Sequence, residues 1–366
     1  MQFEISKAQL LKPLMNGSGV VEKRQTLPVL SNLLLRLENG CLEIVGTDLE
    51  VEVSAMCNDV VGTNGSTTVP ARKFVDIVRS FPEDSTIRFE VAENKVICTS
   101  GRSRFQLSTL DAAEFPRMEL DSEAETVNMP GATLKQLLNK TAFAMASQDV
   151  RYYLNGLLMQ IKDETLTTVA TDGHRLAFTK TEVSLKQDYE TSVIIPRKGV
   201  GELSRLIEEG EKTLSMQLGK KHVMVQSDNI TLKSKLIDGR FPDYERVIPS
   251  ESDNRLVTDK VILREALART AILSNEKYRG VQLTLETGQL TIQTHNPEQE
   301  EAEEKLSIDY TGQNIEIGFN VNYLIDAISI IDSEQVRLDF TDAHSSVLIR
   351  SMEDEHTLYV VMPMRL

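Results

Sequence analysis

Hydrophobic and polar residues recur along the chain in one order of patterns, written three times. Near the start of each third, apolar residues at helical spacing predict an amphipathic helix. These residues are Leu10, Leu11 and Leu14, then Leu134, Leu137 and Leu138, then Leu263, Ala266 and Leu267. Ser6 with Gln9 and Thr133 with Gln136 form capping-box signatures, and Asp259 is the cap expected for the third helix.

Each predicted helix is followed by two segments of alternating residues, which predict a pair of strands at 31–48, 154–172 and 279–296. The pairs end on Asp48, Asp172 and Asn296, which are 124 residues apart each time. A second helix is expected in VPARKFVDIV, IPRKGVGELSRL and IGFNVNYLIDAI. Each copy then finishes on a strand and a proline, at Pro116, Pro242 and Pro363. We conclude that the chain is a threefold internal repeat.

The repeat defines the expected fold class. Each unit of about 120 residues contains two helices and roughly eight strands, an α+β module with its helices on one face of a curved antiparallel sheet. A chain of 366 residues is too long for one compact core. We therefore expect three domains, at 1–124, 125–246 and 247–366, arranged as an arc.

The composition narrows the class of protein. No stretch approaches the roughly 20 apolar residues that span a bilayer, and the first ten residues lack the features of a signal peptide. The three cysteines, Cys41, Cys57 and Cys98, support neither a disulfide framework nor a CxxC metal site. We expect a cytoplasmic protein with buried thiols and no cofactor or metal.

The charge is acidic overall but unevenly distributed. The net charge is −15, of which residues 246–366 carry −10, so general affinity for nucleic acid is not expected. The predicted helices nevertheless carry many basic residues, which would line one surface if the helices share a side of the arc. The candidates are Lys7, Lys12, Arg72, Arg79, Lys135, Lys140, Arg197, Lys198, Arg205, Arg264 and Arg269. The alternative is that these are ordinary solvated helix charges.

Several stretches resemble one family from end to end. TVPARKF, QDVRYYLNG, ATDGHRLA, IIPRKGV, DGRFPDY, AILSNEK, NPEQEEAEE and YVVMPMRL are similar to the β subunits of bacterial DNA polymerase III, the sliding-clamp family. The resemblance implies a processivity factor without catalytic activity. It also implies a ring of two chains, joined head to tail, that encircles duplex DNA without reading its sequence and tethers DNA polymerase III.

The resemblance also assigns contact residues. It implies that Arg24, Arg72, Gln148, Tyr152 and Tyr153 touch DNA, whereas the two tyrosines could instead belong to the core. It implies a chain-to-chain interface through Phe105, Ile272 and Leu273. Complementary charges surround these residues, with Lys73, Lys95, Arg102 and Arg104 in the first repeat and Glu298, Glu300, Glu301 and Glu304 in the third. The acidic run could alternatively be a solvated loop or, less simply, a metal site.

The apolar tail YVVMPMRL has two interpretations. Its valines could simply end the last strand, but the methionines that follow form an adaptable surface for partners. The resemblance implies a groove for short peptides of the polymerase III catalytic subunit, the clamp loader, other polymerases, ligase and mismatch-repair proteins. Its walls would be Leu154, Thr171, Gly173, His174, Arg175, Leu176, Pro242, Arg246, Val247, Asn320, Tyr323, Ser346, Val360, Val361, Met362, Pro363, Met364 and Arg365. His344 departs from the small apolar residue expected at the rim.

The rival hypothesis is a hydrolase or transferase that uses His174 as a base and Asp172 to orient it. The sequence offers no GxSxG, Walker A or HExxH motif to serve such a base. Asp172 also has counterparts in Asp48 and Asn296, which favours a role in forming a turn.

Overall fold

The computed structural model describes residues 1–22, 27–119, 125–185, 189–207 and 212–365. By its internal contacts the chain divides into two compact units, residues 1–135 with 198–236 and residues 136–197 with 237–366. Each unit therefore contains one whole predicted repeat and half of the second. No helix of the described residues is long and apolar enough to cross a membrane.

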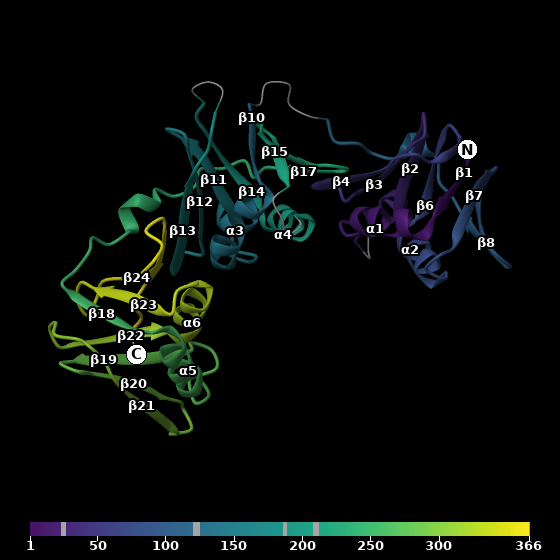
Figure 1. The fold of residues 1–366 in the computed structure, drawn as a ribbon. Coiled ribbons are helices and arrows are strands. Elements are labelled where there is room, and N and C mark those ends of the chain that lie inside the picture. The colour runs from purple at the N-terminus through teal and green to yellow at the C-terminus, as the bar shows by residue number, and fades with distance from the viewer. Residues whose placement is uncertain (23–26, 120–124, 186–188, 208–211, 366) are drawn as a thin grey trace. The chain divides into compact units, whose positions relative to one another are not determined.

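Among its described residues, the first repeat has two α-helices and nine strands, in the order that the pattern predicts. Figure 1 shows how these elements lie in the unit. They are β1 (Gln2–Ser6), α1 (Lys7–Ser18), β2 (Asn32–Glu38), β3 (Cys41–Thr47), β4 (Val51–Cys57), β5 (Val61–Thr63), β6 (Gly65–Pro70), α2 (Ala71–Ser80), β7 (Thr86–Ala92), β8 (Lys95–Ser100) and β9 (Ser103–Ser108).

The other two repeats each have two helices and eight strands among the described residues. The second comprises β10 (Thr126–Pro130), α3 (Gly131–Thr141), β11 (Gly156–Lys162), β12 (Thr165–Thr171), β13 (Arg175–Glu182), β14 (Thr191–Pro196), α4 (Arg197–Leu206), β15 (Thr213–Leu218), β16 (His222–Ser227) and β17 (Ile230–Lys235). The third comprises β18 (Asn254–Asp259), α5 (Lys260–Ala271), β19 (Gly280–Glu286), β20 (Gln289–His295), β21 (Glu301–Ser307), β22 (Ile315–Asn320), α6 (Val321–Ile330), β23 (Gln335–Phe340), β24 (Val347–Ser351) and β25 (Thr357–Val361).

All strand pairs in the sheets are antiparallel, and each unit has one large and one small sheet. The first unit contains β5-β1-β7-β8-β9 and β10-β15-β16-β17-β4-β3-β2-β6. The second contains β14-β11-β12-β13-β25-β24-β23-β18 and β21-β20-β19-β22. Each large sheet joins two repeats, through β4 with β17 in one and β13 with β25 in the other.

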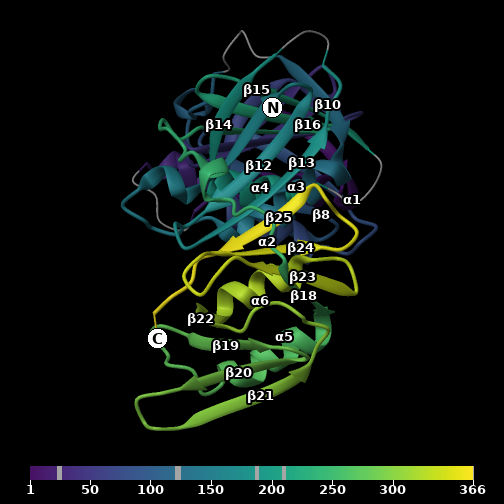
Figure 2. The same ribbon diagram turned by 90° about the vertical axis from the view of Figure 1, so that its left-hand side faces the viewer.

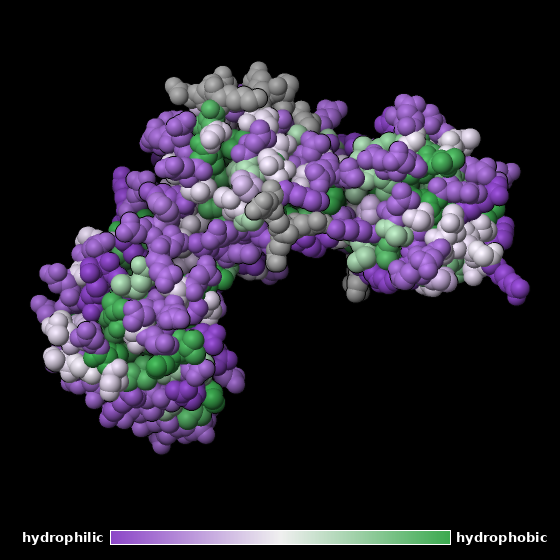
Figure 3. All heavy atoms as spheres, in the orientation of Figure 1, coloured by the Kyte–Doolittle hydropathy of each residue, from purple (hydrophilic) through white to green (hydrophobic). Residues whose placement is uncertain are grey.

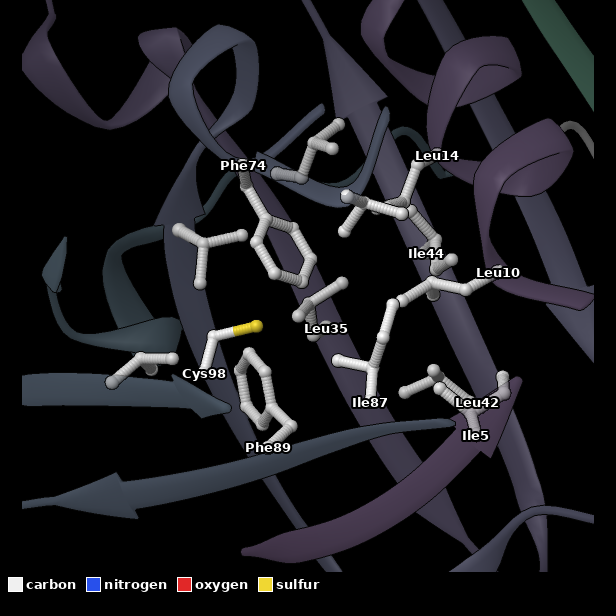
Figure 4. Packing of buried hydrophobic residues seen from close by; sticks show 14 of the residues in the cluster. Ile5, Leu10, Leu14, Leu35, Leu42, Ile44, Phe74, Ile87, Phe89 and Cys98 are labelled. Atoms are coloured by element: carbon white, nitrogen blue, oxygen red, sulfur yellow. The ribbon is translucent and has the colours of Figure 1, made fainter. Parts of the chain in front are cut away.

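The core of the first repeat shows why the sequence alternates. Leu35 on β2 packs with Leu10 and Leu14 of α1 (Figure 4). Leu33 belongs to the same cluster, whereas Leu34 belongs to a separate cluster on the opposite side of the sheet. The period of two in a strand therefore divides one apolar run between two faces. In the third repeat, α5 packs against α6 and against β19, β20 and β21 (Figure 2).

The predicted helix caps have different outcomes. Ser6 caps α1, and its Oγ accepts a hydrogen bond from the Gln9 N–H. Asp259 caps α5 in the same way, through the Ile262 N–H. The prediction for Thr133 is wrong, because α3 begins at Gly131 directly after the last residue of β10 and already includes Thr133. β10 ends at Pro130, and the helix follows it without a loop.

Candidate functional site

A side-chain turn precedes the strand at each junction between repeats. Asp172 Oδ1 accepts the N–H groups of His174 (2.9 Å) and Arg175 (3.0 Å), and β13 follows directly. Asp48 closes the equivalent turn before β4, and Asn296 accepts the Glu300 N–H before β21. Because the oxygen of each side chain holds backbone donors, the predicted turn-forming role is confirmed.

The tail at the end of the chain completes the second junction. Leu176 on β13 pairs with Val360 on β25, and Arg175 pairs with Val361. Beyond β25, the Met362 N–H donates to the His174 carbonyl and the Met364 N–H to the Gly318 carbonyl, both at 2.8 Å. The apolar tail is therefore a structural bridge between the large sheet of its unit and β22 of the small sheet.

An apolar cluster covers the side of this junction that faces away from α3. Thr168 on β12 hydrogen bonds to Thr141 of α3, so its neighbour Val169 points to the other face. There the cluster is formed by Leu158, Val169, Leu176, Ile194, Phe241, Leu348, Leu358 and Val360, with Tyr153, Phe178, Ile237, Tyr244 and Ile248 partly buried against it. We call these residues, with the predicted groove residues, the junction site.

Arg175 connects both repeats within the junction site. Its guanidinium forms ion pairs with Asp172 and Asp326, donates to the Phe143 carbonyl and lies 4.6 Å from the centre of the Tyr323 ring. The Tyr323 ring also stacks on His174, and burial raises the pKa of its hydroxyl. Arg175 thus holds the wall together through contacts within the protein.

The predicted groove residues differ in exposure. Leu154, Thr171, Leu176, Val360 and Val361 are buried. Arg175, Asn320, Tyr323, Ser346, Pro363 and Met364 are partly buried. Gly173, His174, Pro242, Arg246, Val247, Met362 and Arg365 are exposed. His344 is also exposed, and its N–H donates to Asp342.

The first junction carries charge where the second is apolar. Glu52 on β4 pairs with Lys233 on β17, as Leu176 pairs with Val360. The Glu52 carboxylate is fully buried and accepts from Lys233 Nζ (3.0 Å), Arg117 Nε (3.3 Å) and the Met118 N–H (2.8 Å). Arg117 also pairs with Glu43. We call Glu43, Glu52, Arg117 and Lys233 the charged plug.

The third repeat has a polar hollow at the equivalent place. Its volume is about 830 Å³, and its floor includes Gln282 and Gln293, which pair with each other across β19 and β20. Leu158 and Val169 form the corresponding pair in the second repeat. Met364 and Arg365 form part of the wall. In the first repeat the corresponding pair is Leu34 and Val45, which lies in a buried apolar cluster. The third repeat is therefore the one that is polar on this face.

The two small sheets end in strands of opposite charge. β9 is an end strand that carries exposed Arg104, with exposed Arg102, Lys95 and Lys73 on nearby segments. β21 is an end strand that carries exposed Glu301 and Glu303, and Glu298 and Glu300 precede it. The alternative of a solvated loop does not hold for the second half of the acidic run, since Glu301–Ser307 form a strand. The described residues contain no group of acidic, histidine or cysteine side chains that could hold a metal ion.

Apolar residues predicted at the chain-to-chain interface lie near these end strands. Phe105 on β9 is partly buried and meets Phe81 edge to face, with ring centres 5.7 Å apart. Ile272 is 75% exposed just after α5, and Leu273 is partly buried. Polar side chains cover most of the rest of the visible surface (Figure 3).

The prediction of a basic lining is wrong for Lys7, and several other candidates are paired within the protein. Lys7 is buried, and Lys198 is neutralised by Glu22 and Asp48. Lys140 pairs with Asp354 (2.7 Å) and Arg205 with Glu202 (2.6 Å). Further candidates pair in the same way, Arg79 with Asp76 and Arg269 with Glu304, while Arg197 donates to the carbonyls of Met145 and Ala146. Among the described ion pairs, none involves Arg72 or Arg264, and Arg72 is exposed.

The residues of the second-repeat loop expected at DNA differ in exposure. Gln148 and Tyr152 are exposed, the latter by 56%, and Gln148 has a φ of 57°. Tyr153 instead packs against the apolar cluster of the junction site. Arg24 and most of its loop lie outside the residues that the structure describes. Lys12 and Lys135, two further candidates for the basic lining, lie within them.

Comparison with known proteins identifies the family. Models of the N-terminal, central and C-terminal domains of the DNA polymerase III beta subunit match residues 1–119, 128–243 and 245–365. A beta sliding clamp of Pseudomonas putida is 50% identical over 367 residues, which cover all of both chains. The crystal structure of the DNA polymerase III subunit beta from Pseudomonas aeruginosa superimposes over all of both chains with a TM-score of 0.98 at 49% identity. A second structure from that organism, a sliding clamp bound to griselimycin, gives 0.97 at 49% identity with the same coverage.

The chain belongs to the DNA polymerase III beta subunit family. It is therefore a DNA sliding clamp, a processivity factor of replication and not an enzyme, with the three-module clamp fold that assembles into closed rings. Its partners are DNA, a polymerase and a second copy of the chain. The rival use of Asp172 and His174 as catalytic groups is thus wrong, and the geometry agrees, because Asp172 is occupied by backbone donors and Arg175.

Sequence analysis missed several clamp residues of the junction site. Phe178, Phe241 and Tyr244 face the same side as Leu176 and were not singled out. Strand alternation from Leu176 would have predicted Phe178, two residues on. Tyr244 begins a short 3-10 helix (Tyr244–Val247), and burial raises the pKa of its hydroxyl. It hydrogen bonds to Gln160, a contact that no local pattern indicates.

Proposed function

We propose that two chains of this clamp join head to tail through β9 of one chain and β21 of the other, and that the ring encloses duplex DNA. The arrangement follows from the junctions inside the chain. At each one, the strand after the side-chain turn pairs with the last strand of the next repeat, β4 with β17 and β13 with β25. By the same rule β21, which pairs only with β20 among the described strands, has a free outer edge. The last strand of the first repeat, β9, pairs with β8 and has a free outer edge as well. Closed symmetry satisfies both strands.

The internal junctions also predict the register of this contact. Glu52, Leu176 and Glu301 are equivalent because they pair with the last residue of the preceding strand in each repeat. Lys233 and Val360 lie opposite the first two. The strand pairs can be followed residue by residue from the first strand of each repeat, β1, β10 or β18, to its last strand. By this route, Gln106 is the residue of β9 that is equivalent to Lys233 and Val360. Glu301 should then face Gln106, and Glu303 should face Arg104.

Charge and apolar contact divide the work at this interface. Lys73, Lys95, Arg102 and Arg104 meet Glu298, Glu300, Glu301 and Glu304. Exposed ion pairs contribute only about 0–1 kcal/mol each, so these charges mainly select the orientation. Phe105, Ile272 and Leu273 supply apolar area, and the exposure of Ile272 supports this role.

A disulfide tests the register. With Cys41 replaced by serine, Arg104→Cys combined with Glu303→Cys should give a covalent dimer on mild oxidation, seen on a non-reducing gel. Directly opposed residues lie about 4.5–5.5 Å apart, within disulfide reach. The matched control, Gln106→Cys with Glu303→Cys, is displaced by two residues and should cross-link much more slowly. Equal rates for the two pairs, or none for either, would refute the proposed contact.

We propose three domains, at 1–124, 125–246 and 247–366. The matched ranges of the three family models support these boundaries.

We also propose that five residues contact DNA, namely Arg24, Arg72, Gln148, Tyr152 and Tyr153. Exposure of Arg72, Gln148 and Tyr152 supports their role. Such side chains suit phosphate and sugar contacts, which hold DNA without reading its sequence. The cytoplasm is the proposed location.

We propose that the junction site binds short linear peptides of the polymerase III catalytic subunit, the clamp loader, other polymerases, ligase and mismatch-repair proteins. Its apolar cluster, with exposed Met362 and Val247 at the edge, supports this function. Griselimycin binding by a similar clamp is consistent with it. Leu176→Asp would place a carboxylate in the cluster and should abolish binding of an apolar peptide.

A further inference from the structure

Arg151 connects the loop assigned to DNA with the turn assigned to peptides. Its Nη2 donates to the Asp172 carbonyl at 3.1 Å. The same guanidinium pairs with Asp149, through Nε at 3.0 Å and Nη2 at 2.8 Å. One side chain thus bridges residues 147–153 and the turn at 171–175.

The turn is closely fitted to this arginine. Gly173 has a φ of 86°, and a Cβ at that position would lie 2.8 Å from Arg151 Nη1. The Gly173 N–H donates to Thr171 Oγ1, while Asp172 holds the next two N–H groups. A shift of Arg151 therefore changes the packing of the turn that carries His174.

The loop depends on the same contact. Asp149 Oδ1 accepts the Arg151 N–H, and Asp149 exchanges two hydrogen bonds with the Asn155 side chain. The bond from Arg151 lowers the pKa of Asp149 to about 2, so the carboxylate is charged at neutral pH. Gln148 and Tyr152 flank this locked segment.

Among the described residues, neither of the other repeats has this tie at the matching position. The positions 124 residues before and after Arg151 are Leu27 and Asn275. The side chain of Leu27 has no hydrogen-bond donor. The side-chain oxygen of Asn275 accepts hydrogen bonds from the backbone of its own turn. Of these three positions, the one in the second repeat therefore carries the arginine bridge.

We propose that Arg151 is a positioning residue that couples the two sites. A peptide seated on the turn at 171–175 restrains the loop at 147–153, so a bound partner changes how Gln148 and Tyr152 meet DNA. This coupling rests on the proposed peptide and DNA sites. It requires no peptide contact by Arg151 itself, because its hydrogen bonds are made within the protein.

The test uses the full chain and a fluorescein-labelled ten-residue peptide rich in leucine and phenylalanine. Anisotropy gives the peptide affinity, and hydrogen exchange followed by mass spectrometry reports residues 147–155 with and without saturating peptide. The variants are Arg151→Met, Arg151→Lys and Leu176→Asp. Arg255→Met is the matched control, because its side chain is similarly exposed (42% against 45%) and ion-paired in the same unit.

In the native chain and in Arg255→Met, bound peptide should slow exchange of residues 147–155 by about threefold. In Arg151→Met, the peptide should bind about fivefold more weakly, since a bridged turn is lost, and saturation should leave exchange of the loop unchanged. Arg151→Lys keeps the charge but has one nitrogen in place of the fork, so it should behave as Arg151→Met does.

The outcomes separate the coupling from the proposed peptide site. Slowing of the loop in saturated Arg151→Met, or its absence in the native chain, overturns the coupling. Failure of the native chain to bind the peptide, or equal binding by Leu176→Asp, overturns the peptide site itself.

Discussion

Lys7 begins α1 with 3% of its surface exposed, and its ammonium group has three acceptors. They are the Phe81 carbonyl (2.6 Å), Glu83 (2.7 Å) and the Arg79 carbonyl (3.1 Å). These groups lie at and beyond the end of α2, so Lys7 ties the two helices of the first repeat together. A charge is retained in this core because each of its donors has a partner.

Lys7→Met should destabilise the clamp, because two backbone carbonyls lose their donor in a buried position. We expect the free energy of unfolding to fall by about 2–3 kcal/mol, measured by urea denaturation. Lys73→Met, on the exposed side of α2, should change it by less than about 0.5 kcal/mol. Similar losses in the two variants would contradict this account.

At the scale of elements, the strand pairs β4–β17 and β13–β25 have the same backbone pairing but opposite chemistry. The first buries the charged plug and the second an apolar cluster. A buried ion pair costs desolvation that its attraction only partly offsets, but removal of one partner leaves a buried charge. The same backbone pairing therefore accommodates either an apolar cluster or a charged plug in which every charge keeps its partner.

Glu52→Leu alone should lower the free energy of unfolding by about 3–5 kcal/mol, since Lys233 and Arg117 lose their buried partner. Adding Lys233→Val reproduces the Leu176 and Val360 pair and should recover more than half of that loss. A double-mutant cycle by chemical denaturation measures the recovery. Glu50→Leu, at an exposed position beside the turn, is the control. Strictly additive losses would show that the pair is not a unit.

The elements were predictable from sequence because strand and helix periods recur at 124-residue intervals. Burial of Lys7 was not, because its acceptors are 72 to 76 residues away. The pairing of Lys198 with Asp48 joins different repeats and has no local signature either. The polarity of the three junctions depends on which strand meets which, information that only the register supplies.

At the scale of the whole molecule, retention on DNA depends on enclosure and little on attraction. Many basic helix residues are already ion-paired, so their field at DNA is reduced. Screening at higher salt weakens what remains but does not open a covalent ring.

A ring closed by the Arg104→Cys and Glu303→Cys disulfide should therefore remain on a nicked DNA circle at 0.5 M salt. Cutting the circle once should shorten its residence by at least about tenfold, because weak phosphate contacts permit sliding off the end. Gel filtration of radiolabelled clamp with DNA measures the bound fraction. Equal residence on cut and uncut DNA would exclude enclosure.

The charged plug has a consequence for the number of partner proteins that one ring can bind at a time. Because the charged plug occupies the first junction, the proposed peptide site is present once in each chain and twice in a dimer. On this proposal, a polymerase and one other enzyme can bind one ring at the same time, and a third binds only after one of them dissociates. Partner proteins would then compete for these two sites. How long each partner stays bound, and its local concentration, would determine the order in which enzymes reach the DNA.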